Sequence, residues 1–120
     1  FQALEDADWR VREVAAVALG RLRDSQAVPA LIQALGDGDW RVRCAAAEAL
    51  GKLGDRRAVP ALIQALGDDE WWVRSYSAQA LKRLRDPRAV PALVRAMADD
   101  DKDVRRAAAE ALEAIARILL

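Results

Sequence analysis

Residues 39–51 read DWRVRCAAAEALG, and a stretch of this kind opens four times along the chain. The other copies begin with DWRVR at residue 8, EWWVR at residue 70 and DKDVR at residue 101, a constant spacing of 31 residues. A fixed period between about 20 and 50 residues is typical of repeat proteins, in which each unit stacks on its neighbours. The period therefore predicts an array of similar units rather than one globular core.

Each unit reads as a helical hairpin. Asp39 is a suitable N-cap for a first helix that begins at Trp40, and Gly54 can end that helix in the left-handed conformation. Apolar residues recur at helical spacing along this helix as Val42, Ala46, Ala49, Leu50 and Leu53, and along a shorter second helix as Val59, Leu62, Ile63 and Leu66. One hairpin cannot cover these apolar faces alone, so stacking must cover them.

The expected fold is an all-α solenoid, a superhelix of stacked helix–turn–helix repeats that forms a single domain. We place a partial unit at 1–7, full units at 8–38, 39–69 and 70–100, and a half unit at 101–120. In the half unit Glu113 and Ala116 replace Gly51 and Gly54, so we expect the last helix to run from about Lys102 towards Leu120.

The composition disfavours some classes of partner. The chain has 19 basic and 19 acidic residues, whereas a general binder of nucleic acid or of anionic membranes would carry a basic excess. No apolar run approaches the roughly 18 residues needed to cross a bilayer, and no charged-then-apolar leader is visible. We therefore expect a cytoplasmic or recombinant protein, and a start at Phe1 rather than Met indicates a trimmed or tagged chain.

The sequence contains few residues that could act in catalysis. Histidine is absent and Cys44 is the one cysteine, so the usual metal ligands and the usual general base are missing. Ser75 and Ser77 have no base to activate them, and the dispersed glycines form no phosphate-binding loop. We expect no enzyme activity, no cofactor and no metal.

A second stripe on each first helix varies between units while the apolar stripe barely changes. Side-by-side stacking would join these stripes into one continuous, concave surface for a protein or peptide partner. Trp72 and Tyr76 stand out there because tryptophan and tyrosine dominate interface hot spots. The expected binding residues are Trp9, Arg10, Glu13, Val17, Trp40, Arg41, Glu48, Trp71, Trp72, Tyr76, Gln79 and Arg83. For Trp9, Trp40 and Trp71, a structural ladder and an aromatic rim for a partner both remain open.

Arginine also recurs outside this surface, at Arg12, Arg43, Arg74 and Arg105. A repeated arginine predicts a structural ladder, and we expect it to pair with acidic groups in the turns, namely Asp39, Asp55 and their equivalents in the other units.

Weak binding to a nucleic-acid backbone is the alternative function. The variable stripes carry a surplus of two positive charges close to tryptophans, which resembles a groove with stacking platforms for bases. Interspersed glutamates would repel the phosphates.

The two ends of the array expose apolar residues that no further unit covers. Such ends favour head-to-tail stacking of copies. The residues expected to mediate this self-association are Phe1, Leu4, Ile115, Ile118, Leu119 and Leu120.

The pattern D-x-x-V-R-x-x-A-A-x-A-L-G, followed by G-D-x-R-A-V-P-A-L-I-x-A-L, runs almost unbroken through residues 39–66. It resembles the HEAT-like repeats of the bilin-lyase type, and artificial scaffolds built from a consensus of those repeats. The resemblance implies a non-catalytic protein-binding scaffold. The hydroxylase branch of that family needs His-Glu pairs that this chain lacks, and its bilin lyases are longer arrays. A natural array fragment and a diversified scaffold are both compatible with the sequence.

Overall fold

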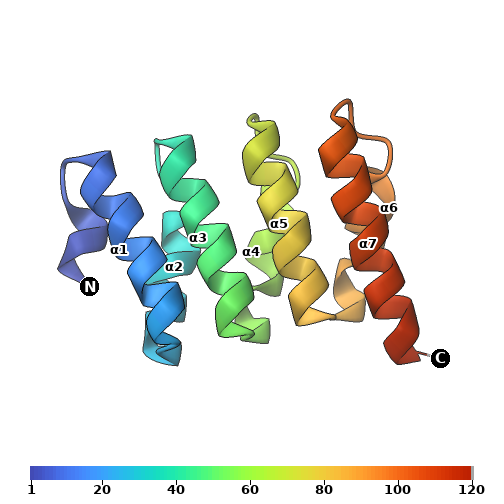
Figure 1. The fold of residues 1–120 in the computed structure, drawn as a ribbon, viewed down its shortest axis with the longest axis horizontal. Coiled ribbons are helices and arrows are strands. Elements are labelled where there is room, and N and C mark those ends of the chain that lie inside the picture. Colours follow the sequence, from blue (N-terminus) through green and yellow to red (C-terminus); the bar gives the residue numbers. More distant parts are fainter. Residues whose placement is uncertain (120) are drawn as a thin grey trace.

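The computed structural model describes residues 1–119, which form two layers of helices in an elongated body of 42 × 28 × 18 Å (Figure 1). The long helices lie side by side in one layer: α1 (Trp9–Leu22), α3 (Trp40–Leu53), α5 (Trp71–Leu84) and α7 (Lys102–Leu119). Behind them lie the short helices α2 (Val28–Ala34), α4 (Val59–Ala65) and α6 (Val90–Ala96). Single 3-10 turns complete the chain: η1 (Gln2–Glu5), η2 (Ser25–Ala27), η3 (Arg56–Ala58) and η4 (Pro87–Ala89). The predicted all-α solenoid of stacked hairpins is confirmed.

Aspartate caps start most of the long helices, as expected. The carboxylates of Asp8 and Asp39 each accept the backbone N–H two residues later, at 2.9 Å. Asp101 accepts two such N–H groups at the start of α7. Glu70 occupies the same position before α5, but its side chain makes no capping bond.

A residue in the left-handed conformation follows three of the long helices. Gly54 has φ of 66° and ends α3, as predicted. Arg23 and Arg85 adopt the same conformation after α1 and α5, with φ of 55° and 52°, although a side chain makes it unfavourable. Helix α7 carries Glu113 and Ala116 in place of Gly51 and Gly54, and it runs on to Leu119, as predicted. Leu120 lies outside the described residues.

The core runs continuously between the two layers. Val42 and Leu50 of α3 and Val59 and Leu62 of α4 are fully buried. Gly20 lets α1 approach α3 closely, because a Cβ built on it would meet the Cα and Cβ of Ala49 at 2.8 Å. No helix among residues 1–119 is long and apolar enough to span a membrane.

The repeated arginines form the expected ladder, but with other partners. The guanidinium groups of Arg12, Arg43 and Arg74 each pair at 2.8 Å with a carboxylate 25 residues later. The aspartates that accept them are Asp37, Asp68 and Asp99, in the turns after the short helices. The prediction of Asp39 and Asp55 was wrong, because these residues cap helices and bind Arg41 and Arg57 instead.

Ile115 corrects the expected set of exposed end residues. Its side chain is 1% exposed and belongs to the core, because this side of α7 faces its neighbouring helices. Leu4 is half-buried against the same core. Phe1, Ile118 and Leu119 are exposed as expected.

Candidate protein-binding surface

The long helices share a surface with a hollow at its centre, which we call the central hollow. Its volume is about 290 Å³, and three adjacent helices line it. The lining residues are Glu13 and Val17 of α1, Trp40, Arg41, Cys44, Ala45 and Glu48 of α3, and Trp72 and Tyr76 of α5. Apart from the small residues Cys44 and Ala45, all of these are expected binding residues, so the structure brings much of the predicted set together.

An aromatic stack borders the central hollow. The Trp72 ring lies 4.1 Å from the Trp71 ring and 6.2 Å from the Tyr76 ring, centroid to centroid. Trp72 is 41% exposed, whereas Trp71 and Tyr76 are half-buried. Burial raises the pKa of the Tyr76 phenol, and the nearby Glu48 carboxylate raises it further. The two flanking rings therefore support an exposed indole.

The recurring tryptophans have a packing role. Trp9, Trp40 and Trp71 are half-buried and pack against the core, which supports the structural ladder. Trp40 and Trp71 also line hollows, so contact with a partner stays a prediction for them. Trp9 is covered by Arg41 of the next unit, whose guanidinium carbon lies 3.6 Å from the ring centroid.

The arginines at the start of this surface are held by their own caps. Arg41 donates from Nε and Nη2 to the two carboxylate oxygens of Asp39, at 2.9 and 2.8 Å. The hydrogen bonds from Arg41 lower the pKa of Asp39, so the carboxylate stays ionised and compensates the guanidinium. Arg10 and Asp8 form the same pair. These arginines present less free positive charge than the sequence implied.

Two further hollows adjoin the aromatic stack. One has a volume of about 60 Å³ and includes the expected residues Gln79 and Arg83. The other has about 270 Å³, lies between α5 and α7, and is lined by Trp71, Trp72, Ser75, Gln79, Asp103, Arg106, Ala107 and Glu110. Asp103, Arg106 and Glu110 are not among the predicted binding residues, although they occupy the same stripe as Arg41 and Glu48.

The variable stripe is not exposed along its whole length. Cys44, Ala45 and Ser75 are buried, because small residues let neighbouring long helices approach each other. Burial also raises the pKa of the Cys44 thiol to about 12, which keeps it protonated and a poor nucleophile. No cluster of metal-ligating side chains occurs in the part of the chain that the structure describes.

The comparisons agree with this architecture. A family model of HEAT repeats matches residues 1–75 and 59–117. No curated protein matches the chain. The complex of CpcE and CpcF of phycocyanin lyase from Nostoc sp. PCC7120 is 38% identical, with a TM-score of 0.84 over 94% of this chain and 50% of that chain. Human deoxyhypusine hydroxylase in complex with glycerol is 29% identical, with a TM-score of 0.84 over 97% of this chain and 42% of that one.

An engineered protein shares the fold at 24% identity, with a TM-score of 0.73 over 96% of this chain and 60% of that one. The chain thus spans about half the length of the two natural structures. Because the family model matches nearly all of it, the chain belongs to the family of HEAT repeats. Within that family it has the architecture of a helical solenoid scaffold.

Proposed function

We propose that this chain is a non-catalytic scaffold that binds a protein or peptide on the surface of its long helices. The observation that carries the proposal is the position of Trp72, an exposed indole stacked on Trp71 and Tyr76 between two hollows. A rigid aromatic side chain beside a pocket is typical of an interface hot spot, where truncation costs about 2 kcal/mol or more.

Selection from a displayed library of random peptides tests this proposal. We expect the protein to enrich peptides that lose affinity for the Trp72→Ala and Tyr76→Ala variants, while the helical circular dichroism is unchanged. Val94→Ala is the matched control, because Val94 is 50% exposed on α6, away from the long-helix surface. Enriched peptides that bind the Trp72 variant and the Val94 variant equally would contradict the proposal.

Nucleic acid is the alternative partner, and the charge pairing on the surface disfavours it. Asp8 forms an ion pair with Arg10, and Asp39 forms one with Arg41. These two pairs neutralise as many positive charges as the variable stripes have in surplus. Binding of random oligonucleotides at low and high salt tests the alternative. A steep fall in affinity with salt would support it, because each phosphate contact releases counterions.

We propose, as a second function, that copies of this chain stack end to end, because the arginine ladder has complementary open ends. Arg105 donates to the carbonyl oxygens of Asp99 and Asp100, but no carboxylate within residues 1–119 forms an ion pair with it. Asp6 holds the position of Asp37 in the ladder. Its backbone carbonyl oxygen accepts from Arg12, but its carboxylate forms no ion pair with an arginine of the described chain. A second copy would bring Asp6 to Arg105 and extend the ladder by one step.

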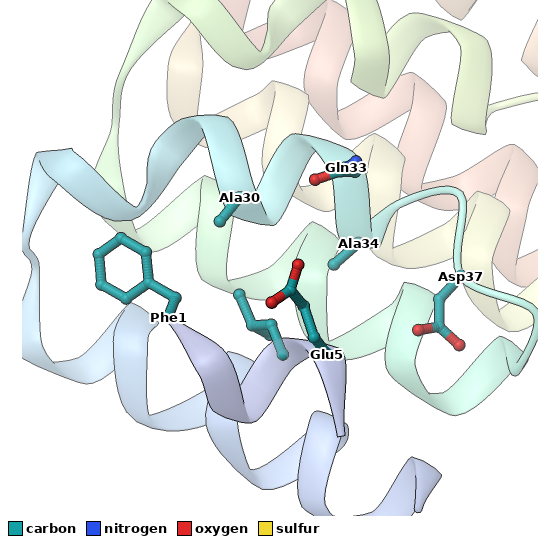
Figure 2. A pocket seen from close by; sticks show the side chains of 7 residues that line it. Phe1, Glu5, Ala30, Gln33, Ala34 and Asp37 are labelled. Atoms are coloured by element: carbon teal, nitrogen blue, oxygen red, sulfur yellow. The ribbon is translucent and has the colours of Figure 1, made fainter. Parts of the chain in front are cut away.

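The N-terminal end also offers space for the tail of another copy. A hollow of about 300 Å³ lies between η1 and α2, and Figure 2 shows Phe1 and Glu5 on one side of it and Ala30 and Ala34 on the other. An apolar hollow of about 210 Å³ adjoins it, between Phe1 and Leu19. We propose that the apolar hollow receives the exposed residues Ile118 and Leu119 at the end of α7 of another copy.

Sedimentation velocity over a wide concentration range tests this stacking. We expect association by the wild type and loss of association in Asp6→Arg and in Arg105→Asp. Association should recover when the two variants are mixed, because the arginine introduced in one chain would then face the aspartate introduced in the other. A wild type that stays monomeric at every concentration would refute the proposal.

A further inference from the structure

The first junction between units already contains a complete binding site for an arginine side chain. The Arg41 guanidinium stacks on the Trp9 ring at 3.6 Å. The Asp39 carboxylate holds the edge of the same guanidinium through two hydrogen bonds. The aromatic face below the guanidinium provides a cation–π contact, and the carboxylate at its edge accepts hydrogen bonds from its N–H groups.

The second junction repeats the tryptophan but not the arginine. Trp40 takes the place of Trp9, 31 residues later, and Trp72 takes the place of Arg41. The Trp72 ring stacks on Trp71 at 4.1 Å, and the central hollow of about 290 Å³ lies beside both Trp40 and Trp72. The arginine that this chain supplies at its first junction is therefore missing at the second.

The central hollow has a negative charge balance. Its acidic lining residues are Glu13 and Glu48, and Arg41 is its basic lining residue. Asp39 compensates Arg41 at 2.8 Å, and Lys52 approaches Glu48 at 3.3 Å. Glu13 has no ion-pair partner among residues 1–119, so one carboxylate charge remains uncompensated.

The negative charges of Glu13 and Glu48 affect the pKa of two groups around the hollow. Glu48 adds to the effect of burial in raising the pKa of Tyr76. Hydrogen bonding to Asp39 raises the pKa of Arg41, and the charge of Glu13 adds to that rise. Beside these larger causes, Glu48 and Glu13 each act on the neighbouring pKa in the direction expected of a nearby negative charge.

We propose that the central hollow binds a basic side chain of the partner, an arginine in preference to a lysine. The guanidinium would stack against Trp40 and Trp72, as Arg41 does against Trp9, with Glu13 and Glu48 as its counter-charges. Arginine is preferred because its planar group stacks on indole rings and pairs with carboxylates in the same plane. This inference rests on the proposed protein-binding function and names the chemistry of the partner at the same surface.

Nuclear magnetic resonance of the indole N–H groups tests the inference with a defined probe. The chain has four tryptophans, so single substitutions can assign the four indole signals. The probe is the peptide Gly-Gly-Arg-Gly-Gly, and its controls carry citrulline or norleucine in place of arginine. We expect the arginine peptide to shift the Trp40 and Trp72 signals and to leave Trp9 unchanged, because Arg41 already covers that ring.

Removal of the counter-charges should weaken this binding. We expect the variant Glu13→Gln with Glu48→Gln to bind the arginine peptide about three- to tenfold more weakly, the range for the loss of two partly exposed ion-pair contacts. The matched control is Asp100→Asn with Glu113→Gln, which changes the net charge equally at exposed positions away from the hollow. An equal loss in both double variants would overturn the inference, as would equal shifts from the citrulline or norleucine peptide.

The peptides selected from the random library separate this inference from the proposed function. Trp72-dependent peptides whose affinity falls when arginine is replaced by citrulline support both. Trp72-dependent peptides without a basic residue would overturn the inference and leave the proposed function intact. A phosphoserine peptide that shifts the Trp40 and Trp72 signals more than the arginine peptide would also overturn the inference.

Discussion

Substitution of Gly20 by alanine tests the close approach of α1 and α3. A Cβ at this position would lie 2.8 Å from both the Cα and the Cβ of Ala49, which is shorter than van der Waals contact allows. Ala49 Cα is backbone, so no rotation of a side chain can relieve the overlap, and one helix has to move. Overpacking of this kind costs about 1–3 kcal/mol.

Alanine also has a favourable effect that opposes this cost. In a helix interior it is about 1 kcal/mol more favourable than glycine. Because the overlap involves backbone, we take the upper half of the overpacking range and expect the free energy of unfolding to fall by about 1–2 kcal/mol. For a domain of this size, that corresponds to a fall in Tm of roughly 4–8 °C.

Two other glycines provide graded controls in the same chain. A Cβ at Gly51 would meet Ala80 Cα at 3.0 Å, and a Cβ at Gly38 would meet nothing within 4 Å. Urea denaturation followed by circular dichroism should rank the losses as Gly20→Ala, then Gly51→Ala, then Gly38→Ala, the last within about 0.5 kcal/mol of the wild type. A Gly20→Ala variant as stable as the wild type would refute this reasoning, because separation of the long helices would then cost no more than the roughly 1 kcal/mol that alanine gains over glycine.

Three further predictions concern stability. Arg43→Ala should lower the free energy of unfolding by about 2–3 kcal/mol in urea denaturation, because the partly buried Asp68 carboxylate and the Asp37 carbonyl both lose their donor. Arg57→Ala is the control and should change this free energy little, because the Arg57 side chain is 56% exposed. Arg85→Gly should raise the same quantity by about 1 kcal/mol, because glycine has no Cβ penalty at φ of 52°; no gain would contradict this reasoning. Hydrogen bonds from arginine lower the pKa of Asp39 and Asp55 in the folded protein. Their contribution to stability is therefore fully present above the pKa of an aspartate in the unfolded chain, about 3.9, and it is lost as the pH falls through their lower pKa in the folded protein. Denaturation at a series of pH values should therefore show constant stability from pH 7 to about 5 and a fall below about pH 4, and an unchanged stability down to pH 2 would refute it.

The helices could be predicted because their signals are local. The capping bond of Asp39 and the left-handed turn at Gly54 depend on residues within one helical turn, and both were confirmed. The end of α5 shows the limit of such signals. Arg85 takes the conformation that glycine favours elsewhere, and Arg23 does the same after α1, so this turn forms at the same place in the repeat without a glycine.

The partners of the arginine ladder could not be predicted from spacing. Arg43 has Asp39, Asp55 and Asp68 within reach of a plausible turn, and the sequence treats them alike. The structure selects Asp68, because Asp39 and Asp55 are occupied as helix caps and paired with Arg41 and Arg57. Which arginine reaches which aspartate depends on the path of the backbone, and only the packed units define that path.

The sequence by itself determined the repeating hairpin, its helix limits and the stripe that varies between units, since a 31-residue period and local caps are properties of the chain alone. Only the tertiary structure decided which residues of that stripe reach the solvent. The spacing between neighbouring long helices buries Cys44 and Ser75 but leaves Trp72 exposed, and it places Arg41 on the tryptophan of the preceding unit. Contacts between residues about 30 positions apart depend on how one hairpin sits on the next, and no local pattern in the chain specifies that geometry.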